Sequence, residues 1–154
     1  MTTPPPAESG TVQLSVADGI AVVSFSHPKG NSLPARLLRE LADAVNAAGA
    51  DDAARVVVLR SEGTGPFCGG ASFDELRAIA DEEAGKEFFM GFARLILAMR
   101  NCPKFVIARV HGRAVGGGVG VAAAADYTLA VSSASVKLSE LAVGIGPFVV
   151  GPAI

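Results

Sequence analysis

The stretch AVGGGVGVAAAAD, residues 114–126, places four glycines within five positions and then continues in alanines. Glycine loses more conformational freedom on folding than any other residue, so this cluster is costly unless a bare backbone is needed there. The small residues that follow predict a helix beginning at the glycines. Two interpretations fit: close packing of elements through Gly112, Gly116 and Gly120, or a backbone anion site at a helix N-terminus.

The spacing of these glycines excludes the common nucleotide-binding loops. A G-x-G-x-x-G loop that starts at Gly116 requires glycine at position 121, which is Val121. The chain also contains no G-x-x-x-x-G-K-[ST] sequence. Phosphate binding by a nucleotide loop is therefore not predicted.

A second bare segment, CGGA at residues 68–71, also precedes a predicted helix start. Ser72 and Glu75 have the S-x-x-E spacing of a capping box. Two such segments can direct two N–H donors at one oxygen, which is the geometry of an oxyanion hole. The sequence leaves open whether the two segments converge.

The remaining pattern alternates strands and helices, which predicts an α/β fold with a parallel or mixed sheet covered by helices. The alternating residues before and after Asp18-Gly19 predict a hairpin. The apolar run at residues 55–61 predicts a strand buried on both faces. The other expected elements are a helix from Pro34 to about Val45, a helix with a buried stripe at Phe88, Phe92, Leu95, Ile96 and Met99, and strands at residues 104–110 and 127–131.

Composition indicates one folded domain. Half of the 154 residues are hydrophobic and 18% are charged, so a core can form. We expect residues 1–10, MTTPPPAESG, to be a disordered tail and residues 11–154 to be the core. A net charge of −2 provides no excess of basic residues with which to bind nucleic acid.

The sequence also argues against an oxidising compartment, secretion and insertion into a membrane. Two cysteines are too few for a disulfide framework and suit a reducing compartment. The N-terminal residues lack the basic and apolar regions of a signal peptide. The longest uncharged runs, residues 114–125 and 141–154, are too short to cross a bilayer. We therefore expect a cytoplasmic protein that does not enter membranes.

Three motifs together carry a family resemblance: FCGGASFDEL at residues 67–76, VHGRAVGGGVGVAAAADYTLAV at 110–131 and VKLSELAVG at 136–144. They resemble the crotonase superfamily, the enoyl-CoA hydratase/isomerase family. Residues 19–41 are similar to its N-terminal segment. The resemblance implies the ClpP/crotonase spiral of repeated β-β-α units, with a mixed sheet covered by helices. It also implies an N-terminal partial chain, because family members continue beyond Ile154 with a further helical part.

The resemblance implies an acyl-CoA site and a role in fatty acid metabolism. The backbone N–H groups of Ala71 and Gly117 correspond to the two donors that hold the thioester oxygen. Glu140 corresponds to a catalytic carboxylate that moves the proton next to the carbonyl. No metal or redox cofactor is implied, since CoA enters with the substrate. Coenzyme A contacts are implied for Asn31, Ser32, Leu33, Gly69, Gly70, Phe73 and Gly116.

One departure from the family pattern affects the expected reaction. Hydratases of the family typically carry a first glutamate where this chain has Gly120, so Glu140 is the one carboxylate that remains. The open alternatives are hydration of a 2-enoyl-CoA and isomerisation of a 3-enoyl-CoA to a 2-enoyl-CoA, of which the departure favours isomerisation. A catalytically impaired acyl-CoA-binding or structural subunit is a further alternative. The resemblance also implies a homo-trimer or hexamer.

Other chemically capable residues have structural interpretations. We expect His111 to be a hydrogen-bonded structural residue, Asp126 to be structural, and Phe88, Phe89 and Phe92 to belong to the core. No C-x-x-C or H-E-x-x-H sequence indicates a metal site. No serine or cysteine has the spacing to His27 or His111 that would indicate a catalytic triad.

Overall fold

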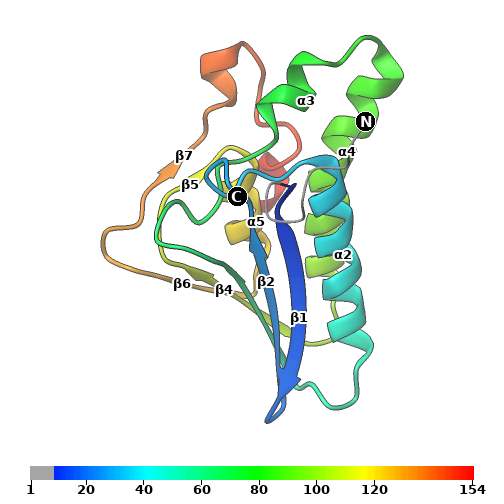
Figure 1. Cartoon of the computed structure of the whole chain (residues 1–154), viewed down its shortest axis with the longest axis vertical. Coiled ribbons are helices and arrows are strands. Elements are labelled where there is room, and N and C mark those ends of the chain that lie inside the picture. Colours follow the sequence, from blue (N-terminus) through cyan, green and yellow to red (C-terminus); the bar gives the residue numbers. More distant parts are fainter. Residues whose placement is uncertain (1–8) are drawn as a thin grey trace.

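The computed structural model describes residues 9–154, which form a five-stranded sheet in the order β1-β2-β3-β4-β6 (Figure 1). The first two strands pair antiparallel and every later neighbour pairs parallel. The predicted α/β architecture with a mixed sheet is confirmed. The strands are β1 (Thr11–Ala17), β2 (Ile20–Ser26), β3 (Val56–Ser61), β4 (Phe105–Val110) and β6 (Tyr127–Ala130).

The hairpin between β1 and β2 turns where the sequence predicts it. Asp18 and Gly19 have φ values of 52° and 80°, so both central residues of the turn are left-handed. A two-residue turn of this hand matches the twist of the flanking strands, and the Asp-Gly pair adopts it at low cost. The turn fixes the register in which Ala17 pairs with Ile20.

Two long helices form the layer beside the sheet (Figure 1). The helix α2 (Ala35–Ala50) packs on β1, β2 and β3, and α4 (Glu82–Arg100) packs on α2 and α5. Leu37, Leu41 and Val45 of α2 are fully buried because they recur at helical spacing on one face. Within residues 9–154, no helix combines the length and apolarity needed to cross a membrane.

The prediction that residues 55–61 are buried on both faces of the sheet was wrong. Val57 and Leu59 of β3 are fully buried, whereas Val56 and Val58 between them are only half-buried. In register with Val56, the side chain of Phe105 on β4 is 54% exposed. One face of the sheet therefore enters the core and the other retains exposed apolar side chains.

The remaining elements are short and surround the site. The strands β5 (Ala114–Val115) and β7 (Val136–Lys137) pair parallel, and α5 (Gly117–Ala124) follows β5 after one residue. The 3₁₀ helix η1 (Glu140–Val143) begins soon after β7. The others are α3 (Phe73–Arg77) and η2 (Gly151–Ala153).

The predicted disordered tail lies outside the described residues except at its last two positions. The carbonyl oxygens of Ser9 and Gly10 accept hydrogen bonds from Nη2 of Arg36, at 2.6 and 3.0 Å. The described core therefore begins at these two residues, ahead of β1.

Candidate active site

The two bare segments meet, which the sequence left open. The N–H of Val115 donates to the carbonyl oxygen of Cys68 at 2.9 Å. A Cβ atom added at Gly70 would lie 2.9 Å from the oxygen of Val115 and 3.6 Å from the nitrogen of Gly117. Only residues without side chains allow this approach. The close-packing interpretation of the glycine cluster therefore holds here, and this packing brings the two possible donor segments together.

Two backbone N–H groups at this junction have no partner in the part of the chain that the structure describes. Gly117 is the first residue of α5, whose opening N–H groups have no carbonyl within the helix to bond. Within residues 9–154, the N–H groups of Ala71 and Gly117 donate no hydrogen bond. Free donors at a helix start attract an oxygen that carries negative charge.

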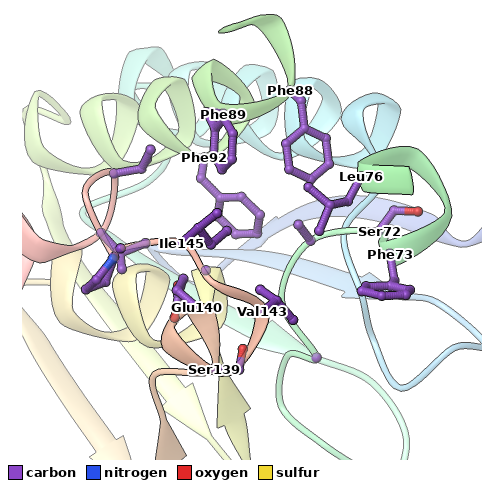
Figure 2. Close-up of a pocket in the computed structure, with 17 residues that line it drawn as sticks. Ser72, Phe73, Leu76, Phe88, Phe89, Phe92, Ser139, Glu140, Val143 and Ile145 are labelled. Carbon is purple, nitrogen blue, oxygen red and sulfur yellow. The ribbon is translucent and has the colours of Figure 1, made fainter. Parts of the chain in front are cut away.

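Both residues line one cavity of about 200 Å³ (Figure 2). Phe88, Phe89 and Phe92 reach it from α4, and Glu140 and Val143 face them from η1. The cavity is therefore mostly apolar, with Glu140 on the wall across from the phenylalanines. The expectation that all three phenylalanines belong to the core was partly wrong: Phe92 is 5% exposed, but Phe89 is 37% exposed.

The carboxylate of Glu140 is held close to the start of α5. Its Oε1 lies 3.4 Å from the position that a Cβ atom on Gly116 would occupy. Its Oε2 is buried and has no hydrogen-bond partner in the described part of the chain. Among the described residues that line the cavity, Glu140 alone has an ionisable side chain. A buried carboxylate oxygen without a partner is free to bond a ligand.

Val150 fills the space beside Gly120, where the family pattern has its other carboxylate. A Cβ atom at Gly120 would lie 2.5 Å from Cγ1 and 2.6 Å from Cβ of Val150. Val150 is 3% exposed and also lines the cavity. The sequence motifs did not predict a site role for Val150 or for its neighbours Ile145 and Val149. The signal was present in the uncharged run at residues 141–154.

Asn31, Ser32 and Leu33 lie behind the cavity and do not line it. All three are buried, and the main chain of Asn31 and of Leu33 holds the CGGA segment in place. The N–H of Gly69 donates to the Asn31 oxygen at 3.3 Å, and the N–H of Leu33 donates to the Gly70 oxygen at 2.8 Å. Of the other residues predicted to contact CoA, Gly69 and Phe73 line the cavity, whereas Gly70 and Gly116 do not, although each adjoins a lining residue in the chain.

The side chain of Asn31 is fully engaged in bracing two loops. Its Nδ2 donates to the oxygens of Glu62 and Pro66, each at 2.9 Å, and its Oδ1 accepts from the N–H of His27 at 2.9 Å. We expect Asn31→Ala to lower the free energy of unfolding by about 2–3 kcal/mol, because buried partners would lose their bonds. Urea denaturation measures this loss. Asn46→Ala, on the exposed face of α2, is the control and is expected to change it by less than about 0.5 kcal/mol.

The capping box at Ser72 is only half formed. The hydroxyl of Ser72 accepts from the N–H of Glu75 at 3.3 Å, as predicted. The Glu75 carboxylate instead accepts from the N–H of Ala35 at 2.8 Å, at the first residue of α2. Glu75 thus ties the loop of the first donor segment to the start of α2.

Other residues that could act chemically are occupied or buried. Burial raises the pKa of the Cys68 thiol to about 12, so it is not a nucleophile near neutral pH. Asp126 is structural, as predicted, because its Oδ2 accepts from the N–H of Val106 at 2.8 Å. His111 was expected to be hydrogen-bonded. This expectation was wrong for its Nε2 atom, which is buried without a partner among residues 9–154. No cluster of three potential metal ligands occurs in that same range.

We expect His27 to make the free energy of unfolding depend on pH. Burial, followed by the charges of Lys29 and Arg36, lowers the pKa of His27 below the ordinary 6.5. His27 therefore binds a proton more readily in the unfolded chain than in the folded one. The stability that the neutral, folded His27 contributes is complete above about pH 6.5 and is lost as the pH falls below it. We expect the melting temperature of the wild type to fall as the pH is lowered from about 7.5 to about 5.5. The melting temperature of the His27→Asn variant is expected to fall less over the same range. An equal drop in both proteins would contradict this role.

Comparison with known proteins identifies the family. Residues 15–153 match the family model of enoyl-CoA hydratase/isomerase. Human mitochondrial methylglutaconyl-CoA hydratase is 36% identical over 130 residues, which are 84% of this chain and 38% of that protein. A (7aS)-7a-methyl-1,5-dioxo-2,3,5,6,7,7a-hexahydro-1H-indene-carboxyl-CoA hydrolase of Rhodococcus jostii is 36% identical over 132 residues, 86% of this chain and 51% of that protein.

The fold comparison agrees. The crystal structure of a Mycobacterium smegmatis enoyl-CoA hydratase matches with a TM-score of 0.87 and 28% identity, over 97% of this chain and 57% of that one. The chain thus spans between 38% and 57% of the length of these three proteins. The match of residues 15–153, which are nearly the whole chain, to one family model, together with the crotonase fold, shows that the chain belongs to the enoyl-CoA hydratase/isomerase family.

Proposed function

We propose that this chain carries the acyl-CoA site of an enoyl-CoA isomerase or hydratase. One observation carries the proposal: two free backbone donors, at Ala71 and Gly117, and the unpartnered carboxylate of Glu140 share a single apolar cavity. The relatives named above act on CoA thioesters, which supports a thioester as the substrate. The apolar walls suit an acyl chain.

In the proposed site, the thioester oxygen lies between the N–H groups of Ala71 and Gly117. When a base removes the proton on the carbon next to the carbonyl, negative charge moves onto that oxygen. Fixed donors stabilise the charge where it develops, and one such donor contributes about 3–4 kcal/mol to the transition state. The donors therefore lower the barrier more than they strengthen binding of the substrate.

Glu140 is the proposed base. For isomerisation of a 3-enoyl-CoA, its carboxylate takes the proton from C2 and returns it to C4 while the double bond moves to C2–C3. This reaction needs no other ionisable group. Among the described residues that line the cavity, Glu140 is the one with an ionisable side chain. Hydration of a 2-enoyl-CoA is the second reaction in this proposal, since the relative from M. smegmatis is named a hydratase. The proposal requires no metal or redox cofactor.

The proposal is tested by incubating the protein with a short 3-enoyl-CoA and, separately, with the matching 2-enoyl-CoA. Mass spectrometry and chromatography then distinguish a shifted double bond from a gain of one water. Conversion of either substrate supports the proposal. Binding of both thioesters without conversion or hydrogen exchange would contradict it and favour a binding subunit instead.

We also propose that copies of the chain associate, as trimers or as pairs of trimers in the cytoplasm. Support comes from the partly exposed apolar face of the sheet, where Ile20 is 42% and Phe105 is 54% exposed. Exposed apolar surface of this kind favours association. Light scattering of the purified protein measures the mass, and a monomer at high concentration would contradict this part.

A further inference from the structure

Val150 lines the cavity and packs against Gly120, which lies behind it in α5 and does not line the cavity. Gly120 lies in α5, where an added Cβ atom would be 2.5 Å from Cγ1 of Val150 and 3.3 Å from Cδ1 of Ile96. The turn that carries Val150 is pinned by a hydrogen bond of 2.7 Å from the N–H of Gly151 to the Pro147 oxygen. Val150 therefore occupies a fixed position that any side chain at residue 120 would need.

The surroundings of this contact are unsuited to water. Val150 and Ile96 are 3% and 9% exposed, and Phe92 on the adjoining wall is 5% exposed. An ordered buried water needs two to four polar partners, and these side chains offer none. The polar side chains that line the cavity come from other segments: Ser72, Ser139 and Glu140.

The two candidate reactions differ in their need for water. In isomerisation the C2–H bond breaks, the electron pair shifts, and a C4–H bond forms from the proton on Glu140, so no atom is added. In hydration a C3–O bond and a C2–H bond form, the C2–C3 double bond becomes single, and water gives up a proton to a base. Hydration thus needs a positioned water and a group to activate it.

We propose that Val150, packed on Gly120, is a specificity-determining residue that keeps a water-activating group and its water out of the cavity and so restricts this site to proton transfer. The inference rests on the proposed function and narrows it to isomerisation. Val150 acts by filling space, while Glu140 and the donors of Ala71 and Gly117 perform the chemistry.

A set of three variants tests the proposal. Gly120→Glu combined with Val150→Gly supplies a second carboxylate and the room for it, Val150→Gly alone supplies only the room, and Gly120→Glu alone supplies the carboxylate without room. We expect the wild type to isomerise a 3-enoyl-CoA without adding water. We expect the double variant to hydrate the matching 2-enoyl-CoA at least about 100-fold faster than either single variant.

A gentler variant covers the case in which the double variant fails to fold. Val150→Thr keeps the branched shape of the side chain and adds a hydroxyl that can hold a water. We expect the ratio of hydration to isomerisation to rise about tenfold in this variant. Circular dichroism confirms that each protein is folded before the rates are compared.

Exchange of the hydrogens on C2 with deuterated solvent distinguishes a failure of the role of Val150 from a failure of the proposed function. A wild type that exchanges hydrogen and adds water as fast as it isomerises would overturn the role of Val150 and leave the proposed function standing. Folded double and Val150→Thr variants that both fail to add water would overturn it as well. A wild type without exchange or isomerisation would overturn the proposed function together with this inference.

Discussion

Replacing Glu140 by glutamine is expected to reduce the turnover of a 3-enoyl-CoA by about 10³-fold or more, while the binding of the thioester changes little. An amide cannot take the proton from C2, but it keeps the size and shape of the carboxylate. The fold is expected to survive, because Oε2 of Glu140 has no hydrogen bond within the described residues that the substitution could break. Initial rates and thermal melting, measured on the same preparation, test both statements.

The matched control is Glu83→Gln, which makes the same chemical change in the exposed first turn of α4. Its carboxylate lies outside the cavity, so no measurable change in turnover is expected. Undiminished turnover in Glu140→Gln would remove Glu140 from the mechanism. Equal losses in both variants would indicate an effect of net charge and not of the site.

Replacing Gly118 by alanine is expected to lower the free energy of unfolding by about 2–3 kcal/mol. The added Cβ atom would lie 2.7 Å from Cβ and 2.8 Å from the carbonyl oxygen of Cys68. Alanine is the better helix former by about 1 kcal/mol, so any net loss reports the clash directly. The same oxygen accepts from the N–H of Val115, so the two donor segments are expected to separate and activity to fall as well.

Gly65→Ala is the control for this prediction. The position has no atom within 4 Å of an added Cβ, and its φ lies outside the left-handed region. A change of less than about 0.5 kcal/mol is expected there. Urea denaturation of both variants gives the comparison. A Gly118→Ala protein as stable as the wild type would show that the CGGA segment moves freely relative to α5.

Much of the fold follows from local patterns that the sequence displays. The Asp18-Gly19 turn, the apolar stripe of α2 and the hydrophobic strands are all properties of a few neighbouring residues. They depend on backbone preferences and on the spacing of apolar side chains, which are the same wherever the segment lies. The motifs around Ala71, Gly117 and Glu140 are also local, so their family resemblance could be read directly.

Other expectations failed because they depend on neighbours distant in the chain. The burial of β3 on both faces was one such expectation. Leu141 and Val143, the apolar neighbours of Glu140 in the sequence, are likewise 73% and 52% exposed, because η1 lies at the surface. The apolar wall across the cavity from Glu140 comes from phenylalanines of α4. Burial of a short surface turn cannot be read from its own hydrophobicity, since it depends on which element packs against it.

The sequence by itself determined the order of strands and helices, the hairpin turn, and the presence of two bare backbone segments and one candidate carboxylate. Only the tertiary structure decided that the two segments meet, that Asn31 braces the loop around Glu62 and Pro66, and that Val150 occupies the space beside Gly120. The physical reason is range. Backbone conformation and amphipathic periodicity are set within a few residues, whereas close packing joins residues 30 or more positions apart and exists only once the chain has closed.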